Sequence, residues 1–136
     1  WIHVQMEKRC RPIPNIVTAP FPGFSTDLQS ALMAVLSTAD GISFVEEKIF
    51  EARFQIVPEL VKMGASIVNQ DSFALIEGGR RLSGAKVQAR ELRGGAGLIM
   101  AALAAEGETV MEGMEYVRRG YEDIKGDLKS LGIVIY

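Results

Sequence analysis

Arginine residues stand at two predicted helix starts, where a guanidinium could bind a phosphate or a carboxylate. Arg93 is followed by Gly94, Gly95 and Gly97 at the start of a long apolar helix. Each glycine costs a helix about 1 kcal/mol relative to alanine, so three of them need a reason. Open backbone N–H groups, the helix dipole and Arg93 would together bind an anion. Close packing against a neighbouring helix is the alternative, and it explains the glycines slightly better.

The second arginine, Arg119, lies in the run Arg118-Arg119-Gly120-Tyr121-Glu122, just before another predicted helix. Its guanidinium could form two parallel hydrogen bonds to a phosphate or carboxylate group. A surface arginine is the plainer interpretation, and for a single arginine it usually holds. The position therefore supplies a candidate, and a functional claim needs further support.

A carboxylate occupies the corresponding place at an earlier helix. Asp27 follows a turn-rich run from Pro20, with Thr26 suited to the N-cap and Gln29 to its capping-box partner. On position alone we favour a carboxylate that complements the positive end of the helix dipole.

The charged positions recur at an interval of 66 residues, since 93 − 27 = 66 and 119 − 53 = 66. This offset aligns Asp27 with Arg93 and Arg53 with Arg119. Such a period is too long for an ordinary solenoid repeat and favours a duplicated α/β unit whose helices share one core. A chance convergence of mostly apolar patterns is the alternative.

The predicted elements follow from apolar periodicity and turn residues. We expect helices at 28–39, 58–63, 92–105 and 121–131. We expect strands at 1–6, 42–50, 65–69, 73–76, within 82–89, at 108–113 and at 133–136. Residues 51–54 should form the exit of a strand, and residues 114–120 a loop. The first helix should bury a stripe formed by Ala31, Leu32, Val35, Leu36 and Ala39. The whole chain, 1–136, should form a single α/β domain that contains the two copies, 27–69 and 93–136.

Composition excludes several classes of function. The chain has 136 residues, 48% of them hydrophobic, and a net charge of only −2, which argues against a general nucleic-acid surface. One cysteine, Cys10, excludes an internal disulfide, and with the single His3 it argues against a metal site. No run is long enough to span a membrane, so we expect a cytoplasmic protein. Because the chain begins at Trp1, we expect a piece of a longer protein.

Several motifs in order resemble the C-terminal third of the UDP-N-acetylglucosamine 1-carboxyvinyltransferases, a branch of the enolpyruvyl transferases. The motifs are Thr18-Ala19-Pro20 with Pro22-Gly23-Phe24, Thr26-Asp27-Leu28-Gln29, Ile49-Phe50-Glu51-Ala52-Arg53-Phe54, Glu91-Leu92-Arg93 and Arg118-Arg119-Gly120-Tyr121-Glu122. Any one would be weak, but four or more in order are specific. The sister enzymes that act on shikimate 3-phosphate share the fold, and the Thr-Asp-Leu-Gln and Arg-Gly-Tyr-Glu runs favour the UDP-sugar branch.

This resemblance implies a fold and a reaction. The fold is an inside-out barrel of repeated βαβαβ-type units, of which two are present here. The reaction transfers the enolpyruvyl group of phosphoenolpyruvate to the 3-hydroxyl of UDP-N-acetylglucosamine in peptidoglycan synthesis, and it needs no metal or cofactor. The family also implies a second, N-terminal domain, which has no counterpart in this sequence. We therefore expect no turnover from the chain alone, and an exposed apolar flank that favours self-association.

The resemblance also implies roles for individual residues. Asp27 is the candidate to accept the proton of the sugar hydroxyl, and Arg119 is the second catalytic candidate. Substrate binding is assigned to the set Asp27, Ile49, Phe50, Arg53, Arg93 and Arg119, with Arg93 and Arg119 at the phosphoenolpyruvate end.

The sequence departs from the family pattern at four places. Ser25 replaces a proline, Ala52 an asparagine, Glu91 an aspartate, and Arg118 an aspartate beside Arg119. A non-catalytic module that binds a nucleotide sugar or another anion, or one that only packs as a structural domain, is the alternative function. Balanced charge disfavours a relative that processes RNA ends.

Overall fold

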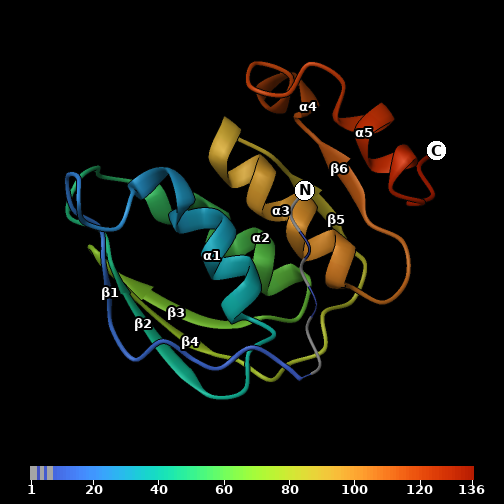
Figure 1. The fold of residues 1–136 in the computed structure, drawn as a ribbon. Helices are drawn as coiled ribbons and strands as arrows, with labels where there is room; N and C mark the ends of the chain where they lie inside the picture. The colour runs from blue at the N-terminus through green and yellow to red at the C-terminus, as the bar shows by residue number, and fades with distance from the viewer. Residues whose placement is uncertain (1–2, 4, 6–7) are drawn as a thin grey trace.

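A four-stranded sheet forms one side of the protein in the computed structural model, which describes residues 3, 5 and 8–136 (Figure 1). Its strand order is β1 (Ile16–Val17), β2 (Ile42–Glu46), β4 (Phe73–Glu77) and β3 (Ser66–Gln70). The β1 and β2 strands are parallel, whereas β2 pairs antiparallel with β4 and β4 with β3. The sheet thus joins a parallel edge to an antiparallel hairpin.

Three helices lie between this sheet and a second, smaller sheet (Figure 1). A 3-10 turn (Thr26–Leu28) leads into α1 (Gln29–Leu36), and another (Arg53–Ile56) leads into α2 (Val57–Lys62). Both cover one face of the sheet, and α3 (Leu92–Ala104) packs along α1. Large side chains that are fully buried fill the space between them: Met33, Leu36, Leu60, Met63, Ile76 and Leu98.

The second sheet contains β5 (Lys86–Gln88) and β6 (Val110–Glu112), which run parallel on either side of α3 in sequence. Two short helices, α4 (Met114–Val117) and α5 (Ile124–Ser130), follow it. Each long helix therefore connects two parallel strands, as β1-α1-β2 and as β5-α3-β6. The predicted α/β class is confirmed, and the bounds of the two copies, 27–69 and 93–136, stay a prediction. Among the described residues, no helix is long and apolar enough to span a bilayer.

The hairpin and the second helix were predicted correctly. β3 and β4 meet at Asp71, whose φ of 51° closes the turn, and Glu47 N–H bonds the carbonyl of Ser72 beside it. Pro58 lies in the first turn of α2, where its missing N–H costs nothing. Gly64, with φ of 92°, follows that helix as its stop.

The predicted apolar stripe of α1 is correct for Leu36 and Ala39, which are buried, but its other three members are only half-buried. The side chains turned into the protein include Gln29, Ser30, Met33 and Ser37, whereas Val35 is only half-buried. Polar groups are tolerated there because they are paired within the helix: the Ser37 hydroxyl donates to the Met33 carbonyl at 2.8 Å, and Gln29 Nε2 to Met33 Sδ at 2.9 Å. The helix also begins differently, since Ser25 rather than Thr26 accepts the capping N–H, from Asp27 at 3.2 Å.

The strand predicted at 42–50 is shorter than expected and alternates in burial. β2 ends at Glu46, and its buried residues are Ser43 and Val45, while Ile42 and Phe44 point outward. The strand exit predicted at 51–54 is a turn that leads into the 3-10 helix.

Two predictions near the C-terminus are wrong, and one at the N-terminus falls mostly on residues that the structure does not describe. The loop expected at 114–120 contains the helix α4. Gly113 turns the chain just before this helix, at φ of 77°, and Val117 of the helix is buried against α3. Residues 133–136 form no strand: among the described residues they pair with neither sheet, and the Ile133 N–H instead bonds the Leu128 carbonyl of α5 at 3.1 Å. The strand expected at 1–6 lies outside the described residues, apart from positions 3 and 5, which belong to no element.

Candidate functional site

The starts of α1 and α3 lie beside each other, and an ion pair joins them. Arg93 Nε donates a hydrogen bond to Asp27 Oδ1 at 2.5 Å. Both side chains remain open to solvent, with 58% of Asp27 and 38% of Arg93 exposed. Two residues that the sequence placed at equivalent points of separate copies are therefore in direct contact, and a ligand could reach both.

Glu91 caps the first turn of α3 and so fixes the backbone that carries Arg93. Its carboxylate accepts the N–H of Arg93 at 2.8 Å and that of Gly94. The expected anion site of open N–H groups is thus already occupied by a side chain of the protein. The group that remains to meet an anion is the guanidinium of Arg93, which is paired with Asp27 through Nε.

The glycines of this turn are explained by close packing, the alternative that the sequence slightly favoured. A Cβ on Gly95 would lie 2.5 Å from Val117 Cγ2. A Cβ on Gly97 would lie 2.6 Å from Ile56 Cδ1 and 2.8 Å from the carbonyl oxygen of Ser30. Gly95 thus makes room for α4, whereas Gly97 lets α1 approach α3 and so helps Asp27 to reach Arg93.

Arg53 connects the Phe50 loop to the cap of α3. Its guanidinium lies 4.7 Å from the centre of the Phe50 ring, and Nη1 is 3.7 Å from Glu91 Oε2. Only 13% of the Arg53 side chain is exposed. Arg53 thus holds two parts of the candidate site together through a cation–π contact and an ion pair.

The loop that carries Ile49 and Phe50 borders a cavity of about 580 Å³. The cavity is lined by residues 47–54 together with Asp71 and Ser72 of the hairpin turn. Ile49 and Phe50 are 36% and 54% exposed, so their side chains are available to a ligand. Both predicted binding residues therefore line a hollow that is continuous with Arg53.

Ala52, between Phe50 and Arg53, adopts a left-handed conformation with φ of 58° and ψ of 23°. This conformation costs an L-residue with a Cβ roughly 1–2 kcal/mol, and asparagine tolerates it better than alanine. We expect Ala52→Asn to raise the free energy of unfolding by about 0.5–1 kcal/mol, measured by urea denaturation. The matched control is Ala31→Asn in the middle of α1, which should lower it. Equal effects of both substitutions would contradict the assignment of strain to Ala52.

Glu47 was missed as a site residue, although it organises the loop. Its side chain is 3% exposed, and it accepts hydrogen bonds from Thr18 Oγ1, Thr26 Oγ1 and Ile49 N, each at 2.8 Å, and from Phe50 N at 3.1 Å. Burial pushes the pKa of Glu47 upward, but these donors outweigh burial and hold the pKa below its ordinary value of 4.5. Strand alternation could have identified it, since Ser43, Val45 and Glu47 are at every second position.

Arg119 lies apart from the other candidates. It is exposed, and its guanidinium lies 5.3 Å from the centre of the Tyr116 ring. Neighbouring Gly120 approaches Leu92 at the start of α3, so Arg119 is on the side of the molecule where Arg93 lies. Within residues 8–136, no hydrogen bond or ion pair connects Arg119 to the Asp27–Arg93 pair. The neighbouring Arg118 is exposed at the end of α4.

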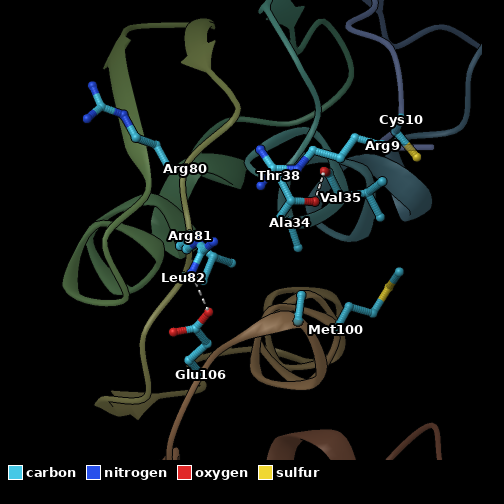
Figure 2. A pocket seen from close by; sticks show the side chains of 11 residues that line it. Arg9, Cys10, Ala34, Val35, Thr38, Arg80, Arg81, Leu82, Met100 and Glu106 are labelled. Carbon is cyan, nitrogen blue, oxygen red and sulfur yellow. Dashed lines mark hydrogen bonds and ion pairs between the residues drawn. The ribbon is translucent and has the colours of Figure 1, made fainter.

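A second cavity, of about 530 Å³, lies near the opposite ends of α1 and α3 (Figure 2). Its charged residues are paired with acidic groups: Arg9 with Asp40 and Arg81 with Glu106, both at 3.3 Å. None of the predicted site residues lines it. In the part of the chain that the structure describes, no three His, Cys, Asp or Glu side chains gather as metal ligands would.

The comparison with protein families shows to which family the chain belongs. A family model described as EPSP synthase (3-phosphoshikimate 1-carboxyvinyltransferase) matches residues 1–128. The chain belongs to the EPSP synthase family. Its similarity to enolpyruvyl transferases, inferred from the Asp27, Arg93 and Arg119 motifs, is thereby confirmed.

Within the EPSP synthase family, similar relatives act on a UDP sugar according to their names. UDP-N-acetylglucosamine 1-carboxyvinyltransferase 2 of Caldanaerobacter subterraneus is 48% identical over 97% of this chain, and its Symbiobacterium thermophilum counterpart, numbered 3, is 50% identical over 87%. The chain spans only 32% and 28% of the length of these two relatives.

Solved structures confirm the fold expected of the EPSP synthase family. The enolpyruvyl transferase NikO from Streptomyces tendae matches 93% of the chain with a TM-score of 0.84 at 31% identity, and the chain covers 29% of it. EPSP synthase from Acinetobacter baumannii matches 64% of the chain with a TM-score of 0.54 at 26% identity, and the chain covers 22% of it.

Proposed function

We propose that this chain forms one wall of the active site of a longer enolpyruvyl transferase, which moves the enolpyruvyl group of phosphoenolpyruvate to the 3-hydroxyl of UDP-N-acetylglucosamine in peptidoglycan synthesis. The contact between Asp27 and Arg93 carries this proposal. It puts a carboxylate able to accept a hydroxyl proton beside a guanidinium able to bind an anion. The names and identities of the relatives support the UDP sugar as substrate.

The proposed chemistry assigns each group a part. Asp27 accepts the proton of the sugar 3-hydroxyl as its oxygen adds to C2 of phosphoenolpyruvate and C3 takes up a proton from the side of the second domain. The tetrahedral adduct then loses a C3 proton together with phosphate, which restores the carbon–carbon double bond. Arg93 leaves Asp27 to bind the phosphate or carboxylate of phosphoenolpyruvate. Arg119, which is exposed, also binds the phosphate or carboxylate. Ile49 and Phe50 contact the nucleotide sugar at the rim of their cavity, with Arg53 behind them.

The proposal includes the setting of the enzyme. A second domain, N-terminal in the longer protein, would supply the opposite wall of the site, so the chain alone should show no turnover. Substrates that are water-soluble nucleotides and phosphates are consistent with a cytoplasmic location, without a nucleic-acid or membrane partner.

Titration of UDP-N-acetylglucosamine into the chain, followed by calorimetry, tests the binding part of the proposal. We expect Asp27→Asn to raise the Kd about tenfold, the effect of losing one hydrogen bond to a charged group. Asp40→Asn is the matched control, because Asp40 also pairs with an arginine but lies beyond the opposite end of α1. It should leave the Kd unchanged.

Other outcomes of this titration separate the alternatives. Binding of shikimate 3-phosphate in preference to the UDP sugar would place the chain in the sister branch. No binding of either compound would contradict the proposal and favour a structural module. Phosphate release above background from both substrates would contradict the expected lack of turnover.

We also propose that the isolated chain associates with itself. Met100 and Leu103 on α3 and Val110 on β6 expose 40–50% of their surface, and these apolar side chains come from adjoining elements. We expect light scattering to show a mass that rises above 14.8 kDa as concentration increases. A constant monomer mass at high concentration would contradict this expectation.

A further inference from the structure

The two loops that carry the proposed base and the proposed sugar contacts share one buried side chain. Glu47 lies just beyond the end of β2, and its carboxylate has a donor on each side. Oε1 accepts bonds from Thr18, Ile49 and Phe50, whereas Oε2 accepts one from the Thr26 hydroxyl. The Asp27 turn is therefore connected to the Ile49–Phe50 loop through the two oxygens of a single residue.

The bonds favour an ionised carboxylate in that place, since Glu47 accepts all four of them. An ionised carboxylate only accepts hydrogen bonds, and its two oxygens offer about four acceptor positions. Here four protein donors, two hydroxyls and two backbone N–H groups, bond the carboxylate, three of them at Oε1 and one at Oε2. An amide nitrogen or a hydroxyl in place of Oε1 would set a donor against the Ile49 and Phe50 N–H groups, whereas in place of Oε2 it would reverse the bond with the Thr26 hydroxyl. The site is thus built for a negative charge that serves the protein rather than a ligand.

The contacts continue from this carboxylate to the anion-binding side of the candidate site. Phe50, whose N–H is bonded to Glu47, carries the ring below Arg53, and Arg53 pairs with Glu91. Glu91 accepts the N–H of Arg93. An unbroken series of contacts therefore runs from the Asp27 turn through Glu47 to the residue that faces Asp27 from α3.

We propose that Glu47 is a positioning residue of this active site, which sets the distance between the Asp27 turn and the Ile49–Phe50 loop. Glu47 touches no substrate in this role. The inference rests on the proposed function, because it assigns those two loops to one sugar-nucleotide site. Its consequence is that breaking the single bond between Oε2 and Thr26 disturbs both loops, although the two loops are more than twenty residues apart in sequence.

Three variants that each change one threonine test this role, and a fourth changes Glu47 itself. Thr26→Val removes the donor to Glu47 and keeps the shape of the side chain, whereas Thr26→Ser retains the hydroxyl. Thr38→Val is the matched control: the Thr38 hydroxyl is also partly buried, but it donates to Val35 within α1 at 2.9 Å. Glu47→Gln serves as a second probe that keeps the shape of the carboxylate.

Amide spectra of the unliganded chain give the first measurement. We expect Thr26→Val and Glu47→Gln to shift the amide resonances of Ile49 and Phe50, and Thr26→Ser and Thr38→Val to leave them in place. Shifts confined to residues 25–28 in Thr26→Val would overturn the inference. Because no ligand is present, this result is decisive for Glu47 even if the chain proves unable to bind the sugar nucleotide.

Calorimetric titration of UDP-N-acetylglucosamine gives the second measurement. We expect the Kd to rise about tenfold in Thr26→Val and to return to within about twofold of wild type in Thr26→Ser. An unchanged Kd in Thr26→Val, with wild-type binding intact, would overturn the positioning role. Absence of binding by the wild-type chain would instead contradict the proposed function, and the spectra would still decide the role of Glu47.

Discussion

Asp27→Asn should lower kcat/KM by roughly 10²–10⁴ in an enzyme that contains both walls of the site, because general-base catalysis contributes about that factor. Such an enzyme can be made by exchanging this chain for the matching segment of the Caldanaerobacter subterraneus relative, which is 48% identical over 132 residues. Asparagine keeps an oxygen that can accept the bond from Arg93 Nε, but it cannot take up the hydroxyl proton. The loss should therefore appear mainly in kcat, measured by phosphate release.

The control for this experiment is Asp40→Asn in the same hybrid. It removes the same charge from the other end region of α1, where Asp40 pairs with Arg9 at 3.3 Å. Its kcat/KM should stay within about twofold of the unmodified hybrid, as for a surface ion pair worth less than 1 kcal/mol. A similar small effect of Asp27→Asn would show that Asp27 is a helix-capping carboxylate and not the base.

The sequence contained enough information to predict the elements with strong local signals. Turn residues around Asp71 predicted the β3–β4 hairpin, and Pro58 and Gly64 predicted both ends of α2. The apolar run after Arg93 predicted α3 almost to the residue. These features depend on backbone preferences within a few residues, which do not change when the rest of the chain folds.

Features set by contacts distant in sequence could not be read in the same way. Met114–Val117 forms a helix because Val117 is buried against Gly95, and local polarity gave no sign of this. The buried face of α1 includes Ser30. Gly97 of α3 has no side chain, so the Ser30 carbonyl can pack closely against it. Tertiary packing thus widened the buried face beyond Leu36 and Ala39, the two members of the predicted apolar stripe that are buried.

The candidate site shows the same division. The interval of 66 residues aligned Asp27 with Arg93, but alignment of two positions in a repeat does not place them in contact. Their ion pair requires α1 and α3 to pack with their starts together. Glu47 was overlooked because a charged residue at the polar end of a predicted strand is usually solvated, and only the folded chain brings Thr18 and Thr26 to it.

Gly97→Ala should destabilise the chain by about 1–3 kcal/mol, the usual cost of forcing an extra methyl group into a packed core. Helix propensity alone predicts the opposite sign, a gain of about 1 kcal/mol, because alanine is the better helix former. The added Cβ would lie 2.6 Å from Ile56 Cδ1 and 2.8 Å from the Ser30 carbonyl oxygen. Since Ser30 O belongs to the backbone of α1, the helices must separate, which should also weaken the Asp27–Arg93 contact. Urea denaturation measures the change.

A double-mutant cycle shows whether this packing is the cause. Ile56→Val removes the Cδ1 atom that the new methyl group would meet, but it leaves the Ser30 carbonyl in place. We therefore expect the double variant to be less destabilised than the sum of the single variants, by roughly 0.5 kcal/mol or more, with part of the cost remaining. Additive effects would show that Ile56 takes no part in the clash. A stabilising Gly97→Ala would show that α1 and α3 do not approach closely, and then the contact on which the proposed site depends would have no structural basis.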